Sequence, residues 1–318
     1  MMRPKSTWLL AEGNAGLLSQ AIGLSEAAGL PAEHRTLTPR GLWRHVPAAL
    51  WPHPLTAITP DALVPPLPEL LIGCGGKAAA VLAAMRHRVR TVIVQHPRMS
   101  IRKFDLVMAV RHDELTGPNV IVTRTALHRV TPERLAAAAV EWAPRLAHLP
   151  RPLVAVLVGG NNGRFRLDAT VAGRLAGQLA AMMRLDDAGL IVTPSRRTAP
   201  EVRRVLERAL RPLGAHVHDL GADNPYFGML ALADAIIVTG DSVSMMSEAV
   251  ATRAPVLLAD LPGRSRRIGL FARALIADGR ARPFTGRLAM WEAAPIDDTR
   301  AAAAEMCKRF GYAAPADV

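Results

Sequence analysis

The feature that most restricts the fold of this sequence is its alternation of short β-branched runs with longer segments rich in alanine and leucine. The short runs are almost wholly apolar, as in Leu153 to Val158. Such runs are expected for strands that are buried on both faces of a sheet. The longer segments have the length and composition of helices. Strands and helices that alternate along a chain build parallel sheets covered by helices, so the sequence predicts an α/β fold.

The first half of the chain contains six strand signals and two clear helices. The predicted strands are residues 8–11, 34–37, 70–73, 91–95, 106–110 and 120–123, and the predicted helices are residues 16–28 and 77–86. Residues 42–68 are rich in proline and predict an irregular excursion. A capped helix at 131–146 is followed by Leu-Pro-Arg-Pro at 149–152, which cannot continue it. A length of 318 residues fits two domains, which we expect at 1–150 and 151–318.

The second half restarts the same alternation. Its predicted strands are 153–158, 190–193, 216–219, 235–238 and 255–258, and its predicted helices are 168–183, 199–210, 226–231, 244–252 and 265–278. Both halves open with a strand, a Gly/Asn loop and a helix. We therefore predict two Rossmann-like, doubly wound parallel-sheet domains that face a cleft. Ligands of such sheets bind beyond the carboxyl ends of the strands, which makes the cleft the candidate site.

Three loops of the second half have the chemistry of an anion site, because glycines, hydroxyl groups, guanidinium groups and a helix start can surround a phosphate. The expected binding residues are Gly159, Gly160, Asn161, Gly163 and Arg164 in the first loop, Thr193, Ser195, Arg196 and Arg197 in the second, and Gly240, Asp241, Ser242, Ser244 and Glu248 in the third. The alternative is structural. The first two loops can be turns with solvated arginines, and Asp241 and Ser244 can be helix caps.

The first half has comparable loops at its strand ends. We expect Asn14, Gly16, Gly75 and Arg98 on the side that takes an acceptor. His96 and Asp113 are the candidate catalytic residues, with His112 as an alternative base, since a histidine titrates near neutral pH. A single histidine is more often structural, and the sequence has no Gly-x-Ser-x-Gly or His-Glu-x-x-His motif.

The charge of the chain is strongly biased toward arginine. The formal net charge is +12, and 35 of the 39 basic residues are arginine. An anionic ligand or an anionic membrane surface would explain this excess, and so would the codon usage of a GC-rich genome. We do not expect a nucleic-acid partner, because aromatic residues make up only 4% of the chain and no arginine cluster is interleaved with them.

Cysteines and apolar segments exclude several classes of protein. The two cysteines, Cys74 and Cys307, lie far apart, and they predict neither a disulfide framework nor a metal site. No apolar run approaches the ~20 residues of a membrane-spanning helix. Glu12 and Asn14 interrupt what would be the apolar region of a signal peptide. We therefore expect a cytoplasmic protein, with peripheral attachment at the inner membrane as an option.

Taken together, the motifs resemble those of the mitochondrial-fission Elm family. The resemblance rests on residues 13–27, 96–98, 104–113, 159–168, 193–198 and 224–249. That family looks like a branch of the two-domain GT-B glycosyltransferases, a group that includes nucleotide-sugar epimerases. The resemblance implies that Ser242, Ser244 and Glu248 contact the diphosphate and ribose of a nucleotide sugar. The loop at Ser195 to Arg197 is similar to the donor-phosphate element of lipid-A-type sugar transferases.

Three functions follow from this resemblance. The first is a metal-independent glycosyltransferase that uses a nucleotide-diphosphate sugar, needs no other cofactor, and acts on a cell-envelope or surface acceptor. No metal-binding Asp-x-Asp motif accompanies the loops. The second is a non-catalytic adaptor that recruits a membrane or a protein, as plant members of the family suggest. The third is a nucleotide-sugar epimerase, although the catalytic acid and histidines of those epimerases have no counterparts in this sequence.

Overall fold

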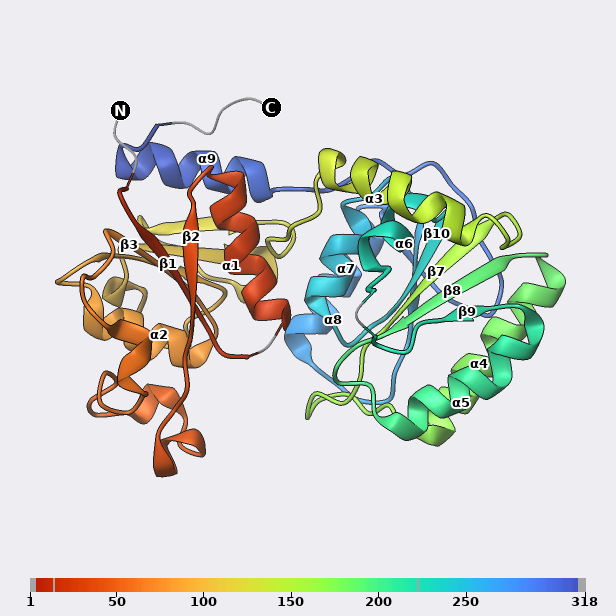
Figure 1. The fold of residues 1–318 in the computed structure, drawn as a ribbon, viewed down its shortest axis with the longest axis horizontal. Helices are drawn as coiled ribbons and strands as arrows, with labels where there is room; N and C mark the ends of the chain where they lie inside the picture. Colours follow the sequence, from red (N-terminus) through yellow and green to blue (C-terminus); the bar gives the residue numbers. More distant parts are fainter. Residues whose placement is uncertain (1–3, 14, 222, 314–318) are drawn as a thin grey trace. The chain divides into compact units, whose positions relative to one another are not determined.

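The computed structural model describes residues 4–13, 15–221 and 223–313, and within them the chain forms two compact units (Figure 1). Unit 1 comprises Met1–Arg129 and Asp297–Val318, and unit 2 comprises Val130–Ile296. The described part of each unit has one six-stranded, fully parallel sheet with helices beside it. The α/β prediction and the prediction of two doubly wound sheets are confirmed.

Unit 1 has the sheet order β2-β1-β3-β4-β5-β6. Its strands are β1 (Thr7–Ala11), β2 (Ala32–Thr36), β3 (Leu70–Cys74), β4 (Arg90–Val94), β5 (Leu106–Val110) and β6 (Val120–Thr123), and its helices are α1 (Ala15–Ala27), α2 (Gly76–Met85) and α9 (Thr299–Phe310). One face of the sheet packs against α1 and α9, and the other packs against α2 and the segment before β3. This is the layering expected for strands that are apolar on both faces.

The segment predicted to be irregular at residues 42–68 contains three short 3-10 turns, η1 (Gly41–Arg44), η2 (Ala48–Leu50) and η3 (Pro60–Leu63). Trp51 anchors this segment: its ring is buried against α2, and its indole Nε1 donates a hydrogen bond to the carbonyl oxygen of Val46 at 3.1 Å. This irregular segment therefore covers, together with α2, the face of the sheet opposite α1 and α9.

The predicted boundary at residue 150 differs from the division between the units. The helix α3 (Pro132–Leu146), which we assigned to the first domain, packs in unit 2 against α6 (Tyr226–Leu232). At Gly228 of α6 a Cβ atom would lie 2.3 Å from Trp142, so only glycine allows this close approach. The sequence signal at 149–152 marks the end of a helix correctly, but a helix end is not a domain boundary.

The helix α9, which the sequence prediction omitted, follows unit 2 in sequence but belongs to unit 1. Ala302, Ala303, Met306 and Cys307 are buried on the sheet face beside α1. Ahead of the helix, Asp298 accepts hydrogen bonds from the backbone and guanidinium groups of Arg124. Unit 1 is therefore built from two segments that are separated in sequence by the whole of unit 2.

Unit 2 has the sheet order β12-β11-β10-β7-β8-β9. Its strands are β7 (Leu153–Val158), β8 (Gly189–Pro194), β9 (His216–Val217), β10 (Ala235–Thr239), β11 (Val256–Ala259) and β12 (Ala281–Pro283). Besides α3 and α6, its helices are α4 (Ala169–Leu185), α5 (Pro200–Leu210), α7 (Val243–Val250) and α8 (Arg266–Ala277). Numbered within the unit, this order is 3-2-1-4-5-6, the order typical of nucleotide-binding doubly wound sheets.

The strand order locates a topological switch point in each unit. In unit 2 the connections leave β7 and β10 in opposite directions, and in unit 1 the same holds for β1 and β3. Adjacent loops diverge at a switch point, which leaves a crevice beyond the carboxyl ends of the two strands. The loop after β7 and the loop after β10 are two of the three loops singled out in the sequence. In the described part of the chain, no helix combines the length and apolar character that crossing a membrane requires.

We predict that Met306→Ala destabilises the protein by about 2–5 kcal/mol, because it removes a fully buried side chain from the α9 contact with unit 1. Urea denaturation followed by circular dichroism measures the change. Lys308→Ala, on the exposed face of the same helix, is the control and changes stability by less than about 0.5 kcal/mol. Equal effects of the two substitutions would show that α9 does not stabilise unit 1.

Candidate functional site

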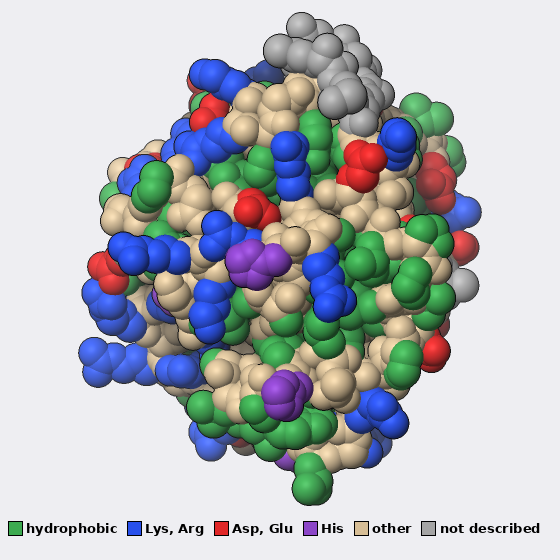
Figure 2. Space-filling view, turned by 90° about the vertical axis from the view of Figure 1, so that its left-hand side faces the viewer, with side chains coloured by type: hydrophobic (Ala, Val, Ile, Leu, Met, Phe, Trp, Pro, Cys, Tyr) green, Lys and Arg blue, Asp and Glu red, His purple; other side chains and the backbone are tan. Residues whose placement is uncertain are grey.

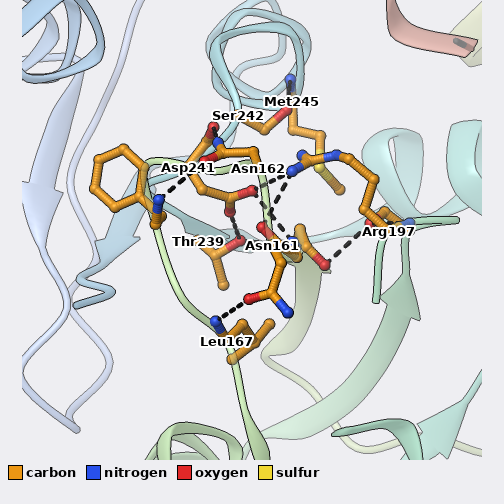
Figure 3. A network of polar contacts seen from close by, with 12 residues as sticks. Asn161, Asn162, Leu167, Arg197, Thr239, Asp241, Ser242 and Met245 are labelled. Carbon is orange, nitrogen blue, oxygen red and sulfur yellow. Dashed lines mark hydrogen bonds and ion pairs between the residues drawn. The ribbon is translucent and has the colours of Figure 1, made fainter. Parts of the chain in front are cut away.

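The centre of the candidate site is the carboxylate of Asp241, which lies just beyond β10 at the switch point of unit 2. Its side chain is 0% exposed. Oδ1 accepts a hydrogen bond from Thr239 Oγ1 at 2.7 Å, and Oδ2 accepts one from the backbone N–H of Gly160 at 3.1 Å. Oδ2 also forms an ion pair with Arg197 Nη1 at 2.9 Å (Figure 3). One carboxylate thus joins the loops after β7, β8 and β10.

The two glycines after β7 allow this carboxylate to approach the backbone. A Cβ atom at Gly159 would lie 2.1 Å from Asp241 Oδ1, and a Cβ atom at Gly160 would lie 2.2 Å from the carbonyl oxygen of Arg197. Both distances are far inside van der Waals contact. We predicted that these glycines let the backbone approach a ligand, whereas here they make room for neighbouring loops of the protein itself.

The loop after β8 is tied to the end of β7 by hydroxyl groups. Ser195 Oγ donates to the carbonyl oxygen of Gly159 at 3.0 Å, and Thr198 Oγ1 donates to that of Val158 at 3.2 Å. Arg197 Nη1 donates in addition to the carbonyl oxygen of Gly160 at 3.1 Å. Thr193 is buried within β8. Arg196, in contrast, is exposed, and it forms no ion pair within the described part of the chain.

The asparagines of the loop after β7 shape its backbone. Asn161 Oδ1 accepts the N–H of Leu167 at 2.7 Å. Asn162 Oδ1 accepts the N–H groups of Arg164 and Phe165, while its amide nitrogen donates to the carbonyl oxygen of Asp241 at 3.0 Å. These bonds hold the Asn-Asn-Gly turn, in which Gly163 has a φ of +74°. The side chain of Arg164 remains exposed at its tip.

Helix α7 starts directly after Asp241 and carries the other predicted residues of the third loop. Ser242 Oγ accepts the N–H of Met245 and caps the helix. Ser244 is half-buried in the first turn, and Gly240 is half-buried ahead of it. Glu248 lies one turn further and is buried, and its Oε2 accepts a hydrogen bond from the hydroxyl of Tyr226 at 2.5 Å.

The hydroxyl of Tyr226 is a permanent donor to this carboxylate. Burial, together with the charge of Glu248, raises the pKa of Tyr226 well above its usual value. The phenol therefore stays protonated at every physiological pH, and it holds one oxygen of Glu248 in a fixed position. Sequence analysis identified Glu248 but missed Tyr226, because the two lie 22 residues apart on different helices.

A fourth loop, which sequence analysis also missed, joins this edge of the sheet. The loop after β11 pairs with the loop after β7 through an isolated bridge between Phe165 and Gly263. Ser265 then caps α8 by accepting the N–H of Ile268. Arg264 is exposed between them. The signal was present as Pro-Gly-Arg-Ser-Arg-Arg at residues 262–267, which follows a strand as the other three loops do.

In unit 1 the switch point contains an ion pair between Glu12, directly after β1, and Lys77, in the first turn of α2. Lys77 Nζ lies 2.8 Å from Glu12 Oε2. Gly75 precedes α2 with a φ of +98°, and Gly16 lies in the first turn of α1. Asn14 lies outside the described residues. Glu12 was absent from the candidates because a single carboxylate at a strand end has no distinctive pattern.

The two predicted catalytic residues are in positions that favour structural roles. His96 Nδ1 accepts the backbone N–H of Arg98 at 2.9 Å, so the neutral ring carries its proton on Nε2 and acts there as a donor rather than as a base. Asp113 is buried, and it accepts the N–H of Val110 while lying 3.6 Å from His112 Nε2. It closes the 3-10 turn η5 (Arg111–Asp113). Their catalytic role stays a prediction.

The structure therefore divides the predicted residues of unit 2 into two sets. Gly159, Gly160, Asn161, Thr193, Ser195, Arg197, Asp241 and Ser242 bond to, or pack against, other parts of the protein. The others are Gly163, Arg164 and Arg196, which are exposed, Gly240 and Ser244, which are half-buried, and Glu248, which is buried and bonded to Tyr226. Among the described residues no group of three or more His, Cys, Asp and Glu side chains is placed to hold a metal ion.

We predict that Asp241→Ala destabilises the protein by about 3–5 kcal/mol, because it leaves the Arg197 guanidinium and the Gly160 N–H without their buried partner. Thermal and urea denaturation measure the loss. Asp260→Ala, at an exposed aspartate after β11, is the matched control and leaves stability nearly unchanged. If Asp241→Ala were as stable as this control, the carboxylate would be available for a ligand rather than required by the fold.

Comparison with known sequences identifies the family to which the chain is similar. Residues 15–310 match the family described as "Mitochondrial fission ELM1". The mitochondrial fission protein ELM1 of Arabidopsis thaliana is 32% identical over 269 residues, which cover 74% of this chain and 62% of that protein. The match thus spans less than two thirds of the plant relative. An uncharacterised protein of Rickettsia prowazekii (strain Madrid E) is 24% identical, with 90% and 92% of the two chains covered.

Comparison with solved structures shows which fold the chain has. The UDP-GlcNAc 2-epimerase of Neisseria meningitidis, bound to UDP-GlcNAc, matches with a TM-score of 0.53 at 10% identity, over 96% of this chain and 100% of that one. MurG of Acinetobacter baumannii matches with a TM-score of 0.51 at 15% identity, over 88% and 85% of the chains. At these identities the similarity extends to the fold alone, which is the GT-B-like pair of Rossmann domains. With a family match that spans residues 15–310, the chain belongs to the mitochondrial fission ELM1 family.

Proposed function

We propose that unit 2 binds a nucleotide-diphosphate sugar at its switch point, and that the protein is a metal-independent glycosyltransferase acting on a cell-envelope or surface acceptor. The observation that carries this proposal is the buried Asp241 network, which fixes three loops at the carboxyl edge of the sheet. A preorganised edge of this kind is what a bound diphosphate requires, since its partners need not reorganise on binding.

The diphosphate would bind at the start of α7, where main-chain N–H groups point outward and the helix dipole favours an anion. Exposed arginines lie in the loops after three other strands of this sheet: Arg164 after β7, Arg196 after β8 and Arg264 after β11. Two of them come from loops that the Asp241 network holds. In a sugar transfer the leaving diphosphate gains negative charge, and fixed guanidinium groups stabilise that charge without a metal ion.

Glu248 would bind hydroxyl groups of the ribose or the sugar. A carboxylate accepts such hydrogen bonds strongly, and the bond from Tyr226 orients it. Tyr226 is then a positioning residue, which acts through Glu248 and not on the ligand. The epimerase that shares this fold is described as bound to UDP-GlcNAc, which supports the same class of ligand here.

Unit 1 would take the acceptor at its own carboxyl edge, near Gly16, Gly75 and Arg98. Glu12 is the carboxylate in the best position to accept a proton from an acceptor hydroxyl, because it is partly exposed at the switch point. Its ion pair with Lys77, at 2.8 Å, orients the carboxylate. This role follows from the strand order of unit 1, whereas His96 and Asp113 are engaged with their own backbone.

Binding is tested by thermal shift and isothermal titration with UDP-, GDP-, CMP- and ADP-sugars. We expect one nucleotide class to stabilise the protein, by about 2.7 kcal/mol at a concentration of 100 times Kd. Arg196→Gln should weaken that binding about tenfold with no change in Tm, because Arg196 forms no ion pair in the described structure that the substitution would break. Arg208→Gln, an exposed arginine on α5, is the control. If no nucleotide sugar shifts the Tm, the proposed function is wrong.

The role of Tyr226 is tested with the two tyrosines of the chain. Tyr226→Phe removes one charge-assisted hydrogen bond to Glu248 and should weaken nucleotide-sugar binding by roughly tenfold, while binding of the bare diphosphate changes little. Tyr312→Phe, at a buried tyrosine of unit 1, is the matched control for loss of a phenol. Equal losses of affinity for the sugar nucleotide and for the diphosphate would show a general loss of fold.

Turnover separates the three functions that the sequence left open. Release of nucleoside diphosphate in the presence of an acceptor supports the glycosyltransferase, and interconversion of the sugar observed by NMR would identify an epimerase instead. Binding without turnover in either assay would identify a non-catalytic nucleotide-sugar protein.

A further inference from the structure

Unit 1 has two hollows that lie away from the carboxyl edge of its sheet and share Arg86 and His87. The first, of about 380 Å³, lies between the 48–54 segment, α2 and the 3-10 turn η4 (Ile101–Lys103). The second, of about 730 Å³, lies at the amino ends of the strands, where Lys5, Glu69, Arg90 and Asp105 line it. Together they form one continuous surface, which we call the basic surface.

The basic surface has more cationic side chains than carboxylates that pair with them. Its cationic side chains are Lys5, Arg86, Arg88, Arg90, Arg102 and Lys103. Arg86 pairs with Asp105 at 3.4 Å, and Arg90 lies over the rings of Phe310 and Tyr312. Arg88, Arg102 and Lys103 are exposed, and none of them forms an ion pair with a carboxylate in the described residues. The composition of the region agrees: residues 40–105 hold nine Lys or Arg and three Asp or Glu.

Two large apolar side chains, Leu42 and Leu50, are exposed in the chain segment that leads into the first hollow. Leu50 is 70% exposed, and its two neighbours in the chain, Ala49 and Trp51, both line the first hollow. Leu42 is 81% exposed in the turn before it. The floor of the hollow is formed by Trp51, Met99 and alanines of α2. In Figure 2, which shows one face of the molecule, Lys and Arg side chains gather on part of the surface and hydrophobic side chains reach the surface beside them.

Exposed leucines next to unpaired cations fit the interface of a membrane with anionic headgroups. Transfer of the leucine side chains from water into the boundary between headgroups and acyl chains lowers the free energy. Each cation near the surface is also stabilised by the negative potential of the headgroups. A small soluble anion would occupy one hollow and leave the leucines in water. A single-stranded nucleic acid would use accessible rings for stacking, whereas Trp51 is buried.

We propose that unit 1 docks onto an anionic lipid bilayer through the basic surface, with Leu42 and Leu50 entering the interface and Arg88, Arg102 and Lys103 contacting headgroups. This docking depends on no residue of the nucleotide-sugar site of unit 2. It would bring a soluble fold to a membrane-bound acceptor if the protein is a glycosyltransferase, and it would equally serve a non-catalytic protein.

The proposal is tested by co-sedimentation of the full chain with vesicles of equal parts phosphatidylglycerol and phosphatidylcholine, and with vesicles of phosphatidylcholine alone. We expect binding to the anionic vesicles only, and we expect added salt to weaken it. The variant Arg88→Gln/Arg102→Gln/Lys103→Gln should lower the partition coefficient about tenfold or more. The control Arg174→Gln/Arg184→Gln/Arg208→Gln removes the same net charge from exposed positions of α4 and α5, and should have little effect.

The apolar part is tested in the same assay. Leu42→Ser/Leu50→Ser should reduce binding several-fold, whereas Val140→Ser/Leu185→Ser, at two side chains of unit 2 that are 80% and 63% exposed, should not. Four results would overturn the proposal: no sedimentation with anionic vesicles, equal binding to neutral vesicles, equal loss in the matched controls, or displacement by millimolar inorganic phosphate, which would indicate a soluble-anion site. Nucleotide-sugar binding by each variant, measured by thermal shift, reports on the proposed function separately.

Discussion

The interaction on which the candidate site depends is the buried carboxylate of Asp241 with its three donors. A charge with no access to water is tolerated only when a counter-charge and hydrogen bonds surround it, and Arg197, Thr239 and Gly160 provide them. Gly160 and Arg197 lie in the loops after β7 and β8, and Thr239 is the last residue of β10. Their geometry therefore fixes the edge of the sheet where the strand order changes direction, and a ligand would meet an edge that is already assembled.

This arrangement changes how the arginines of the chain are understood. Arg196 and Arg197 are adjacent in sequence and identical in chemistry, yet Arg197 is held by a carboxylate and a carbonyl while Arg196 is exposed. The first is held by the scaffold, whereas the second is exposed to solvent. The same distinction applies in unit 1, where Arg86 and Arg90 have partners and Arg88 has none among the described residues. Net charge alone does not separate these cases, since each arginine contributes equally to it.

Much of the fold could be predicted because it depends on local pattern. Strands such as β7 and β10 are buried on both faces, and the resulting apolar runs are visible in sequence. The helix caps Thr131, Asp168 and Ser265 each accept a hydrogen bond at the start of the helix they cap, as their residue types indicate. The predictions missed α9 because it lies beyond a long segment without regular structure, and they placed α3 in the first domain because its partner α6 is distant in sequence.

The sequence by itself determined the order and type of most elements, and it determined which loops follow the strand ends of unit 2. Only the tertiary structure decided which side chains of those loops face the protein. The hydrogen bonds of Asp241 to Gly160 and of Tyr226 to Glu248 span 81 and 22 residues. Such contacts depend on which strands are neighbours in the sheet. Strand order is a property of the whole sheet, so it is not visible in the local sequence around any one of these residues. The same reason explains the basic surface, because α2, η2 and η4 are separate segments of the chain that only the tertiary structure brings together.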